Sequence, residues 1–256
     1  MSQTTTTGEN RFVFVAPMFN ASAYVSQMLA SVVSQSYKNW RVILIDDVSD
    51  QHEVIKQAEI ITRWRTMCEP GMTDDNCDAQ IRVVWNDEKK WEVANVLNGI
   101  SMCDDNDIIC RLDADDWLTD IDALAYLNAL YNHTQAEVLW TAHRWGFTDK
   151  NISGPMPPDA DPYKHPWVSS HLKTFRKRLI NDVKDENFRG EDGSYIRRAG
   201  DQAIYLPVLH NAKRRGFIPR VMYHYTINDV PETYQTPDAR FQRDEALFLR
   251  DRGYVK

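Results

Sequence analysis

The sequence contains few glycines and no glycine-rich phosphate-binding loop. Only 10 of its 256 residues are glycine, and neither a Gly-x-Gly-x-x-Gly pattern nor a Gly-Lys-Ser/Thr loop occurs. Such loops bind phosphates through backbone N–H groups. Their absence counts against a classical dinucleotide-binding fold and a P-loop enzyme, so a metal ion would have to hold any bound phosphate.

Several other features are missing. No apolar run approaches the roughly 20 residues that cross a bilayer, and the polar start, residues 1–10, lacks the basic and apolar regions of a secretory signal. The four cysteines form no Cys-x-x-Cys pair, which argues against a zinc site or a redox motif. We therefore expect a cytoplasmic protein without a membrane span and with a flexible tail at residues 1–10.

The composition is that of a soluble globular protein with one large domain, since 43% of the residues are hydrophobic and 26% are charged. The net charge of -7 conceals a basic segment, residues 173–220, with twelve Lys and Arg against six Asp and Glu. Such a segment suggests an anionic partner. The alternative is that these cations only solvate two helices.

Strand and helix patterns alternate along the first half of the chain. Apolar runs predict strands at residues 11–17, 40–45, 81–85 and 108–112, and helical spacing predicts helices at 21–36, 51–67 and 91–103. This alternation predicts an α/β fold with a mostly parallel sheet flanked by helices. Further on we expect helices at 121–131, 200–215 and 240–252, strands at 137–145 and 217–225, and a proline-rich loop or lid at 146–166.

Two of the predicted strands end in carboxylates. Asp46 and Asp47 follow one strand, and Asp113, Asp115 and Asp116 follow another. Ligands of open α/β sheets bind at the carboxyl ends of the strands. Carboxylates this close repel one another unless a cation joins them, which favours Mg²⁺ or Mn²⁺ shared with substrate phosphates. The alternative is a solvated acidic turn that caps the next helix.

These segments resemble family 2 glycosyltransferases with the GT-A fold. The resemblance is carried by Val-Ala-Pro-Met-Phe-Asn at 15–20, Ser-Val-Val-Ser-Gln-Ser-Tyr at 31–37, Ile-Asp-Asp-Val-Ser-Asp at 45–50 and Leu-Asp-Ala-Asp-Asp at 112–116. Ser-His-Leu-Lys-Thr-Phe at 170–175 is similar to a signature of a subset of these enzymes, many of them from viruses and bacteriophages. The resemblance implies a nucleotide-sugar-binding core at 11–145. It also implies a lid, acceptor-binding and catalytic-base region at 146–256 of the same domain.

The resemblance also implies roles for single residues. Asp115 and Asp116 would bind Mn²⁺ or Mg²⁺ on the donor diphosphate, with His224 or Asn228 as a further ligand. Asp47 would accept a hydrogen bond from the nucleotide base, on which Phe19 would stack, and Asp113 would lie near the ribose. The expected donor-nucleotide residues are Pro17, Phe19, Asn20, Asp47 and Asp113.

The expected reaction is an inverting transfer from a nucleotide sugar, most simply a UDP-sugar. It needs a carboxylate that removes the proton of the acceptor hydroxyl, and the resemblance implies Asp201 in this role. As an isolated residue Asp201 would instead be a helix N-cap. His171, Lys173 and Arg176 are expected to contact donor or acceptor, and the alternative is that Ser169 caps a basic helix carrying His171 on its face.

Two acceptors are open, a carbohydrate and a hydroxymethylated base in DNA of the phage type. The basic segment would suit a phosphate backbone. A non-catalytic nucleotide-sugar-binding protein and a nucleotidyltransferase are the alternative functions. The second usually needs a glycine-rich or basic loop after the first strand, which Pro17 to Asn20 does not provide.

Overall fold

The computed structural model describes residues 8–69, 79–227 and 237–256. The strands are β1 (Phe12–Met18), β2 (Trp40–Asp46), β3 (Ile81–Trp85), β4 (Ile108–Arg111), β5 (Trp117–Leu118), β6 (Val138–Trp145), β7 (Lys173–Arg176) and β8 (Arg215–Tyr225). The α-helices are α1 (Val25–Val33), α2 (Gln51–Cys68), α3 (Trp91–Ser101), α4 (Ala123–Thr134), α5 (Gly200–Asn211) and α6 (Pro237–Arg252). Two short 3-10 helices, η1 (Lys177–Ile180) and η2 (Asp185–Phe188), precede α5.

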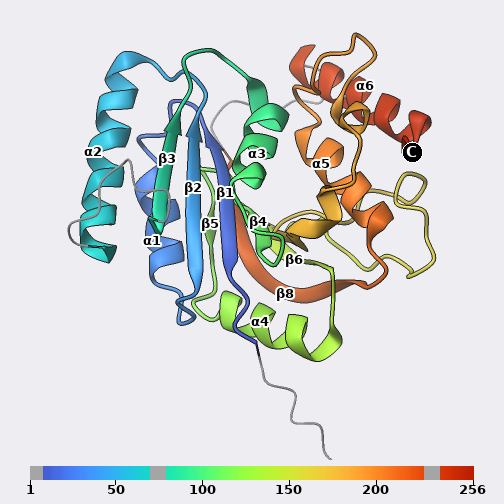
Figure 1. Cartoon of the computed structure of the whole chain (residues 1–256), viewed down its shortest axis with the longest axis horizontal. Coiled ribbons are helices and arrows are strands. Elements are labelled where there is room, and N and C mark those ends of the chain that lie inside the picture. Colours follow the sequence, from blue (N-terminus) through green and yellow to red (C-terminus); the bar gives the residue numbers. More distant parts are fainter. Residues whose placement is uncertain (1–7, 70–78, 228–236) are drawn as a thin grey trace, which may run out of the picture.

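In the described part of the chain, eight strands form one sheet in the order β3-β2-β1-β4-β7-β6-β8-β5 (Figure 1). β1 pairs in parallel with β2 and β4, and β2 pairs in parallel with β3. β6 and β8 are also parallel, whereas β7 and β5 run antiparallel to their neighbours. The prediction of a mostly parallel α/β sheet flanked by helices is therefore confirmed.

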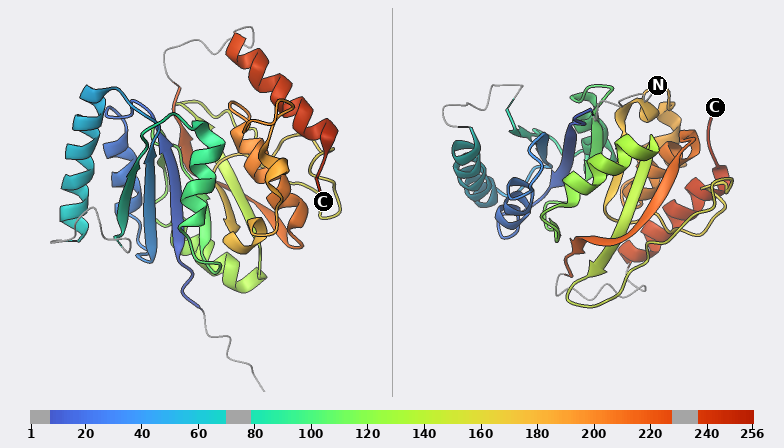
Figure 2. Two further views of the ribbon diagram at one scale, coloured as in Figure 1. Left: turned by 45° about the horizontal axis from the view of Figure 1, so that its top comes forward. Right: turned by 90° about the horizontal axis from the view of Figure 1, so that it is seen from below.

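The apolar strands pack on both faces of the sheet. Phe12 and Phe14 of β1 point to the core shared with α1, α2 and α4, while Val13 and Val15 point to the core shared with α3, α5 and α6. Strands buried on both faces are apolar at nearly every position, which is why β1 and β2 could be recognised as continuous runs. Figures 1 and 2 show α6 lying beside α5 at the far side from α2.

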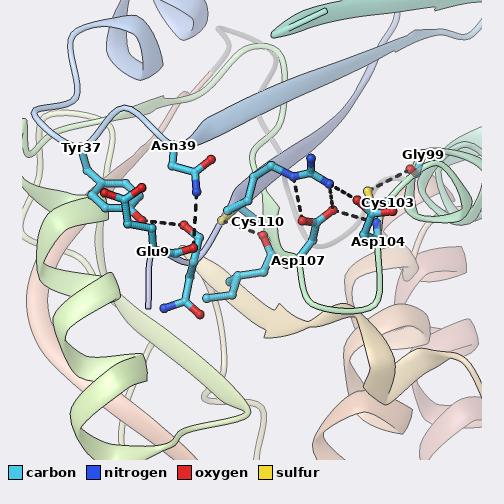
Figure 3. Close-up of polar contacts among 11 residues, drawn as sticks. Glu9, Tyr37, Asn39, Gly99, Cys103, Asp104, Asp107 and Cys110 are labelled. Carbon is cyan, nitrogen blue, oxygen red and sulfur yellow. Dashed lines mark hydrogen bonds and ion pairs between the residues drawn. The ribbon is translucent and has the colours of Figure 1, made fainter. Parts of the chain in front are cut away.

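The end of the sheet where β1 begins is tied by polar contacts (Figure 3). Arg11 donates to Asp107 at 2.8 Å and to Asp104 at 2.5 Å, and Asp107 also accepts the backbone N–H of Asp104. The hydroxyl of Tyr37 donates to the carbonyl oxygen of Asn10. These contacts lie at the amino end of β1, opposite the carboxyl end, which is where ligands of open α/β sheets bind.

Residues 173–176 form a strand and not a basic helix. β7 is inserted between β4 and β6, with Lys173 opposite both Arg111 and Trp140. Four residues are too few for a clear periodicity, and the two basic residues at the ends of the strand concealed it. The structure therefore rejects the reading in which Ser169 caps a helix here. The predicted loop at 146–166 extends to residue 172 without a helix or strand.

Some predictions fall on residues outside the described ranges. These are residues 1–7 of the predicted tail and Asn228 as a metal ligand. Within the described ranges, Cys68, Cys103 and Cys110 are free thiols. No described helix is both long enough and apolar enough to span a bilayer.

Candidate active site

The carboxyl ends of β1, β2 and β4 bring the predicted donor residues to one edge of the sheet. Met18, the last residue of β1, pairs with Asp46 of β2, and its carbonyl accepts the backbone N–H of Asp47 at 2.9 Å. On the other side of β1, Arg111 ends β4 opposite Val15. The acidic residues after β2 and β4 therefore flank the end of β1, at the place where open α/β sheets bind ligands.

The carboxylates of Asp46 and Asp47 accept hydrogen bonds from different parts of the chain. Asp46 is buried, and its carboxylate accepts from the backbone N–H and hydroxyl of Ser49 and from Gln57. Asp47 accepts the backbone N–H of Lys90 at 2.7 Å and of Trp91 at 3.1 Å. Asp46 thus shapes the turn after β2, whereas Asp47 fixes the start of α3 and retains further acceptor positions for a ligand.

Phe19 and Asn20 follow β1 at the same edge. The Phe19 ring is 50% exposed, and the Lys89 ammonium lies 3.7 Å from its centroid. Asn20 has a left-handed backbone (φ 50°), and its side chain exchanges hydrogen bonds with Asp50. Phe19 is therefore available for stacking beside a cation, while the side chain of Asn20 orders the loop. Pro17, the third predicted residue of this segment, lies within β1.

The acidic turn after β4 is crowded. Asp116 is 2% exposed, and its carboxylate accepts from the Tyr223 hydroxyl at 2.6 Å and from the Thr226 backbone N–H at 2.7 Å. Burial, together with the charges of Asp113 and Asp115, raises the pKa of Asp116 to about 8. Carboxylates that raise one another's pKa in this way favour a cation between them and the substrate.

The structure does not gather His224, Asp115 and Asp116 into a three-ligand cluster. Among the described residues, no three His, Cys, Asp or Glu side chains could hold a metal ion together. The His224 ring stacks on Trp117, and its Nδ1 accepts from the Arg144 guanidinium at 3.0 Å. Burial, with the charge of Arg144, lowers the pKa of His224. A guanidinium at this nitrogen disfavours a metal cation nearby, so His224 does not complete the predicted set.

A network of charged side chains lies between β4, β7 and the starts of α3 and α5. Buried Arg111 donates to Glu92 and to Asp113, each at 2.9 Å. Buried Lys173 lies 3.4 Å from the Asp201 carboxylate. Two cations and three carboxylates thus share one region, and burial raises the pKa of Glu92 to about 7 despite the opposing effect of Arg111.

Asp201 is not a helix N-cap. Ala199 occupies the N-cap position of α5 without a side-chain cap, and Asp201 lies in the first turn, accepting the backbone N–H of Gln202. Its side chain is 30% exposed. The carboxylate therefore has a buried cation on one side and solvent access on the other, which suits a group that exchanges a proton with a substrate.

His171 covers Tyr223 beside this network. The two rings stack with centroids 4.5 Å apart, and His143 meets His171 edge-on at 5.6 Å. Burial, followed by the charge of Lys173, holds the pKa of His171 well below its usual value. Its Nδ1 is buried and has no hydrogen-bond partner among the described residues. His171 is therefore a neutral ring next to the residue that binds Asp116.

Arg176 lies away from the edge of the sheet that carries the predicted donor residues. It pairs with Ile108 at the start of β4, and it donates to the Ala136 carbonyl and the Asn10 side chain. The strand geometry separates it from Lys173 by the full length of β7, so the prediction that Arg176 contacts donor or acceptor is corrected. Arg176 directly follows the signature at 170–175, but β7 carries Lys173 and Arg176 to different regions.

Sequence reasoning missed Glu92, Arg111 and Tyr223. An arginine inside an otherwise apolar strand, just before the acidic turn, is a signal that could have identified Arg111. A glutamate in the first turn of a helix is ordinary, and nothing in the sequence links Tyr223 to Asp116, 107 positions away. Both contacts depend on how the strands are arranged.

The fold is that of GT-A glycosyltransferases. Staphylococcus aureus TarS 1-349 in complex with UDP-GlcNAc has a TM-score of 0.65 and 14% identity, covering 88% of this chain and 61% of that one. TarS itself has a TM-score of 0.64 and 16% identity, covering 85% and 37%. The mannosyltransferase PcManGT from Pyrobaculum calidifontis, in complex with GDP-Man and Mn²⁺, has a TM-score of 0.57 and 16% identity, covering 88% and 59%.

The family model described as Glycosyl transferase family 2 matches residues 13–199, which is more than half of the chain. The chain therefore belongs to glycosyl transferase family 2. The uncharacterized protein y4gI of Sinorhizobium fredii is 27% identical over 213 residues, which are 78% of this chain and 21% of that protein. The chain thus spans about a fifth of this curated relative, and less than two thirds of each solved chain described above.

Proposed function

We propose that this chain transfers a sugar from a nucleotide sugar to an acceptor hydroxyl with inversion at the anomeric carbon. The observation that carries the proposal is the pairing of Asp201 with buried Lys173 beside the Arg111–Asp113 contact. This arrangement joins a carboxylate with solvent access to the acidic turn at which a diphosphate would bind. Family membership supports the reaction class.

The donor nucleotide would lie over the ends of β1 and β2. The half-exposed ring of Phe19 would stack on the base, and Asp47 would accept a hydrogen bond from a ring N–H. Uracil has such an N–H, and TarS has been solved with UDP-GlcNAc. We therefore propose a UDP-sugar as donor, with Asp113 near the ribose.

A divalent metal would be held by the acidic turn together with the donor diphosphate. Burial, followed by the charges of Asp113 and Asp115, raises the pKa of Asp116. A hard cation beside these crowded carboxylates would relieve their repulsion. Asp115 and Asp116 would supply the protein ligands, and Mg²⁺ or Mn²⁺ commonly completes its shell with phosphate oxygens and water. When bound, the metal would supply Lewis-acid neutralisation of the leaving diphosphate.

The transfer would take place in one step. The acceptor oxygen forms a bond to the anomeric carbon as the bond from that carbon to the diphosphate oxygen breaks. The acceptor proton passes to the Asp201 carboxylate, and the electron pair of the broken bond leaves with the nucleoside diphosphate. Lys173 would keep the base carboxylate oriented, and His171 would contact donor or acceptor beside it.

Charge pairing favours a saccharide over a DNA acceptor. Six of the twelve Lys and Arg side chains of residues 173–220 form ion pairs: Lys173 with Asp201, Lys177 with Asp105, Arg178 with Glu137, Arg189 with Asp185, Arg198 with Asp238 and Arg220 with Asp120. Binding of a phosphate backbone needs protein cations that neutralise phosphates and so release the counterions condensed on the DNA. These ion pairs make the segment a less favourable site for an anion than its excess of basic residues alone would predict.

The proposal is tested by assaying nucleoside diphosphate release from UDP-GlcNAc and GDP-mannose with Mn²⁺. Free mono- and disaccharides and hydroxymethylated DNA serve as alternative acceptors. We expect release that depends on a saccharide and a glycosylated saccharide in the mass spectrum. A sugar added only to the DNA base would support transfer but overturn the saccharide proposal. Binding of both donors without release would instead support a non-catalytic nucleotide-sugar-binding protein.

A further inference from the structure

The start of α3 lies between the proposed nucleotide site and Asp201, the proposed catalytic base. Asp47 accepts the backbone N–H groups of Lys90 and Trp91, the two residues at which the helix begins. The next residue is Glu92, whose carboxylate reaches Arg111. The first turn of α3 thus contacts Asp47, which is expected to bind the nucleotide base, and also reaches the charged network through Glu92.

Glu92 fixes the orientation of Arg111. The Arg111 guanidinium donates through Nη2 to Glu92 and Asp113, each at 2.9 Å, and through Nη1 to the Val15 carbonyl at 3.0 Å. These contacts come from α3, the acidic turn and β1. Because the guanidinium is planar and rigid, a shift of the Glu92 carboxylate would also shift the arginine that holds Asp113.

The same carboxylate lies against the first residue of α5. A Cβ atom added to Gly200 would stand 2.4 Å from Oε2 and 2.5 Å from Cδ of Glu92. Real Cβ atoms essentially never have such contacts, so in Gly200→Ala either the Glu92 carboxylate or the start of α5 must move. Asp201 is the following residue, and its distance from Arg111 therefore depends on this contact.

We propose that Glu92, in contact with Arg111 and Gly200, is a positioning residue that holds Asp201 in register with the donor-binding turn. The inference rests on the proposed function, because it assigns the geometry of that same site. Glu92 acts through Arg111 and through the backbone of α5, and it contacts neither reacting atom. The carboxylate also faces the charges of Asp113, Asp201 and Lys173.

The contact can be tested with a double-mutant cycle on the full chain. The variants are Gly200→Ala, Glu92→Ala and the double variant. Glu88→Gln is the matched control, since Glu88 is exposed in the loop before α3. The assay measures UDP release from UDP-GlcNAc with Mn²⁺, donor dissociation constants from tryptophan fluorescence, and the midpoint of thermal unfolding.

We expect Gly200→Ala to lower kcat about 100-fold, since displacements of about 1 Å can cost this much. We expect Glu92→Ala to lower kcat about tenfold by the same loss of positioning. In the Glu92→Ala background the added methyl group has room, so Gly200→Ala should cost less than about twofold more, which is the non-additivity expected of residues in contact. Donor affinity should fall less than kcat in every variant, because Arg111 keeps its contacts with Asp113 and the Val15 carbonyl. A general loss of structure would not produce this split between kcat and binding.

Three results would overturn the inference while leaving glycosyl transfer in place. The first is additive effects of the two substitutions on kcat. The second is unchanged kcat in both single variants while Asp201→Asn abolishes turnover. The third is a reversal of the roles of Glu92 and Asp201. If Glu92→Ala abolished turnover and Asp201→Asn did not, Glu92 would be the base itself, and the positioning role would be wrong. Absence of release by the wild-type chain with every donor and acceptor would remove the proposed function and the inference together.

Discussion

Lys173 of β7 and Asp201 of α5, 28 positions apart in the sequence, form an ion pair. Lys173 is the first residue of β7, and its side chain is almost fully buried, with the ammonium 3.4 Å from the carboxylate in the first turn of α5. A buried ammonium needs such a partner, because leaving it unpaired in the interior is costly. The pair therefore ties the proposed base to the strand beside the acidic turn.

Replacing Lys173 with Met should lower kcat at least tenfold with a small change in donor affinity. The methionine keeps the apolar stem but removes the charge that orients Asp201, and geometry of this kind is worth about 10- to 100-fold in rate. Steady-state kinetics with UDP-GlcNAc would check this. Lys177→Met is the matched control, because Lys177 pairs with exposed Asp105 beyond the other end of β7. An equal loss in both variants would contradict a specific role for Lys173.

Replacing Tyr223 with Phe should destabilise the fold and weaken metal-dependent donor binding. The substitution removes the hydroxyl that donates to Asp116 and leaves one buried carboxylate oxygen without that donor. Losing such a partner costs about 1–3 kcal/mol. Urea unfolding would measure the cost, with Tyr126→Phe as the control at an exposed tyrosine. A variant as stable as the wild type would show that Asp116 does not depend on this contact.

The structure assigns a pH dependence to His143. Burial, with the charge of Lys173, lowers the pKa of His143 from 6.5 to about 4. The unfolded chain then binds more protons than the folded chain between pH 6.5 and 4, so this residue makes stability fall as pH is lowered through that window. Each pKa unit is worth about 1.4 kcal/mol, which sets an upper limit of about 3.5 kcal/mol for the contribution of His143.

His143→Asn should therefore flatten the loss of stability between pH 6.5 and 4. The raised pKa of Glu92 acts in the opposite direction between about pH 4.5 and 7, so the informative quantity is the difference between wild type and variant at each pH. Denaturant unfolding at half-unit steps would supply it, and exposed His133→Asn should leave the curve unchanged. A constant offset without pH dependence would contradict the assignment.

Trp91 adopts a left-handed backbone conformation at the start of α3 (φ 66°). This conformation costs residues with a Cβ about 1–2 kcal/mol of folding free energy, and it costs glycine little. Trp91→Gly should therefore be more stable than Trp91→Ala by about 1 kcal/mol, the reverse of the usual order in a helix. Urea unfolding of the two variants would test this, with Glu88→Gly and Glu88→Ala as the comparison pair. Equal stability of the Trp91 variants would contradict the strained geometry.

Much of the fold could be predicted because local patterns and tertiary burial agree. The runs that form β1, β2 and β4 are apolar at almost every position and end at Pro17, Asp46 or Leu112, so their position and type could be recognised. The acidic turn could be found for the same reason. β5 has only two residues and β7 only four, and each is held by strands from other parts of the chain, which no local pattern reveals.

The candidate site was only partly predictable for a related reason. Asp113, Asp115 and Asp116 could be identified because they come directly after a recognisable strand. Glu92 and Gly200 could not be identified, because their proposed role depends on a contact between two helices. Arg176 was misplaced because three residues in a strand span about 10 Å, whereas three residues in a helix would have kept it near Lys173. The positions of these residues depend on strand pairing, which a single sequence does not specify.

The most direct test of the account is the rate of UDP release from UDP-GlcNAc by wild type and Asp201→Asn at saturating donor, acceptor and Mn²⁺. The amide keeps the shape of the side chain but cannot take the acceptor proton at the normal rate. We predict a loss in kcat of about 100-fold or more, within the range for a general base, with unchanged donor affinity. The control Asp182→Asn, at an exposed carboxylate after η1, should keep the wild-type rate. A wild-type rate in Asp201→Asn would contradict the assignment of the base and the mechanism built on it.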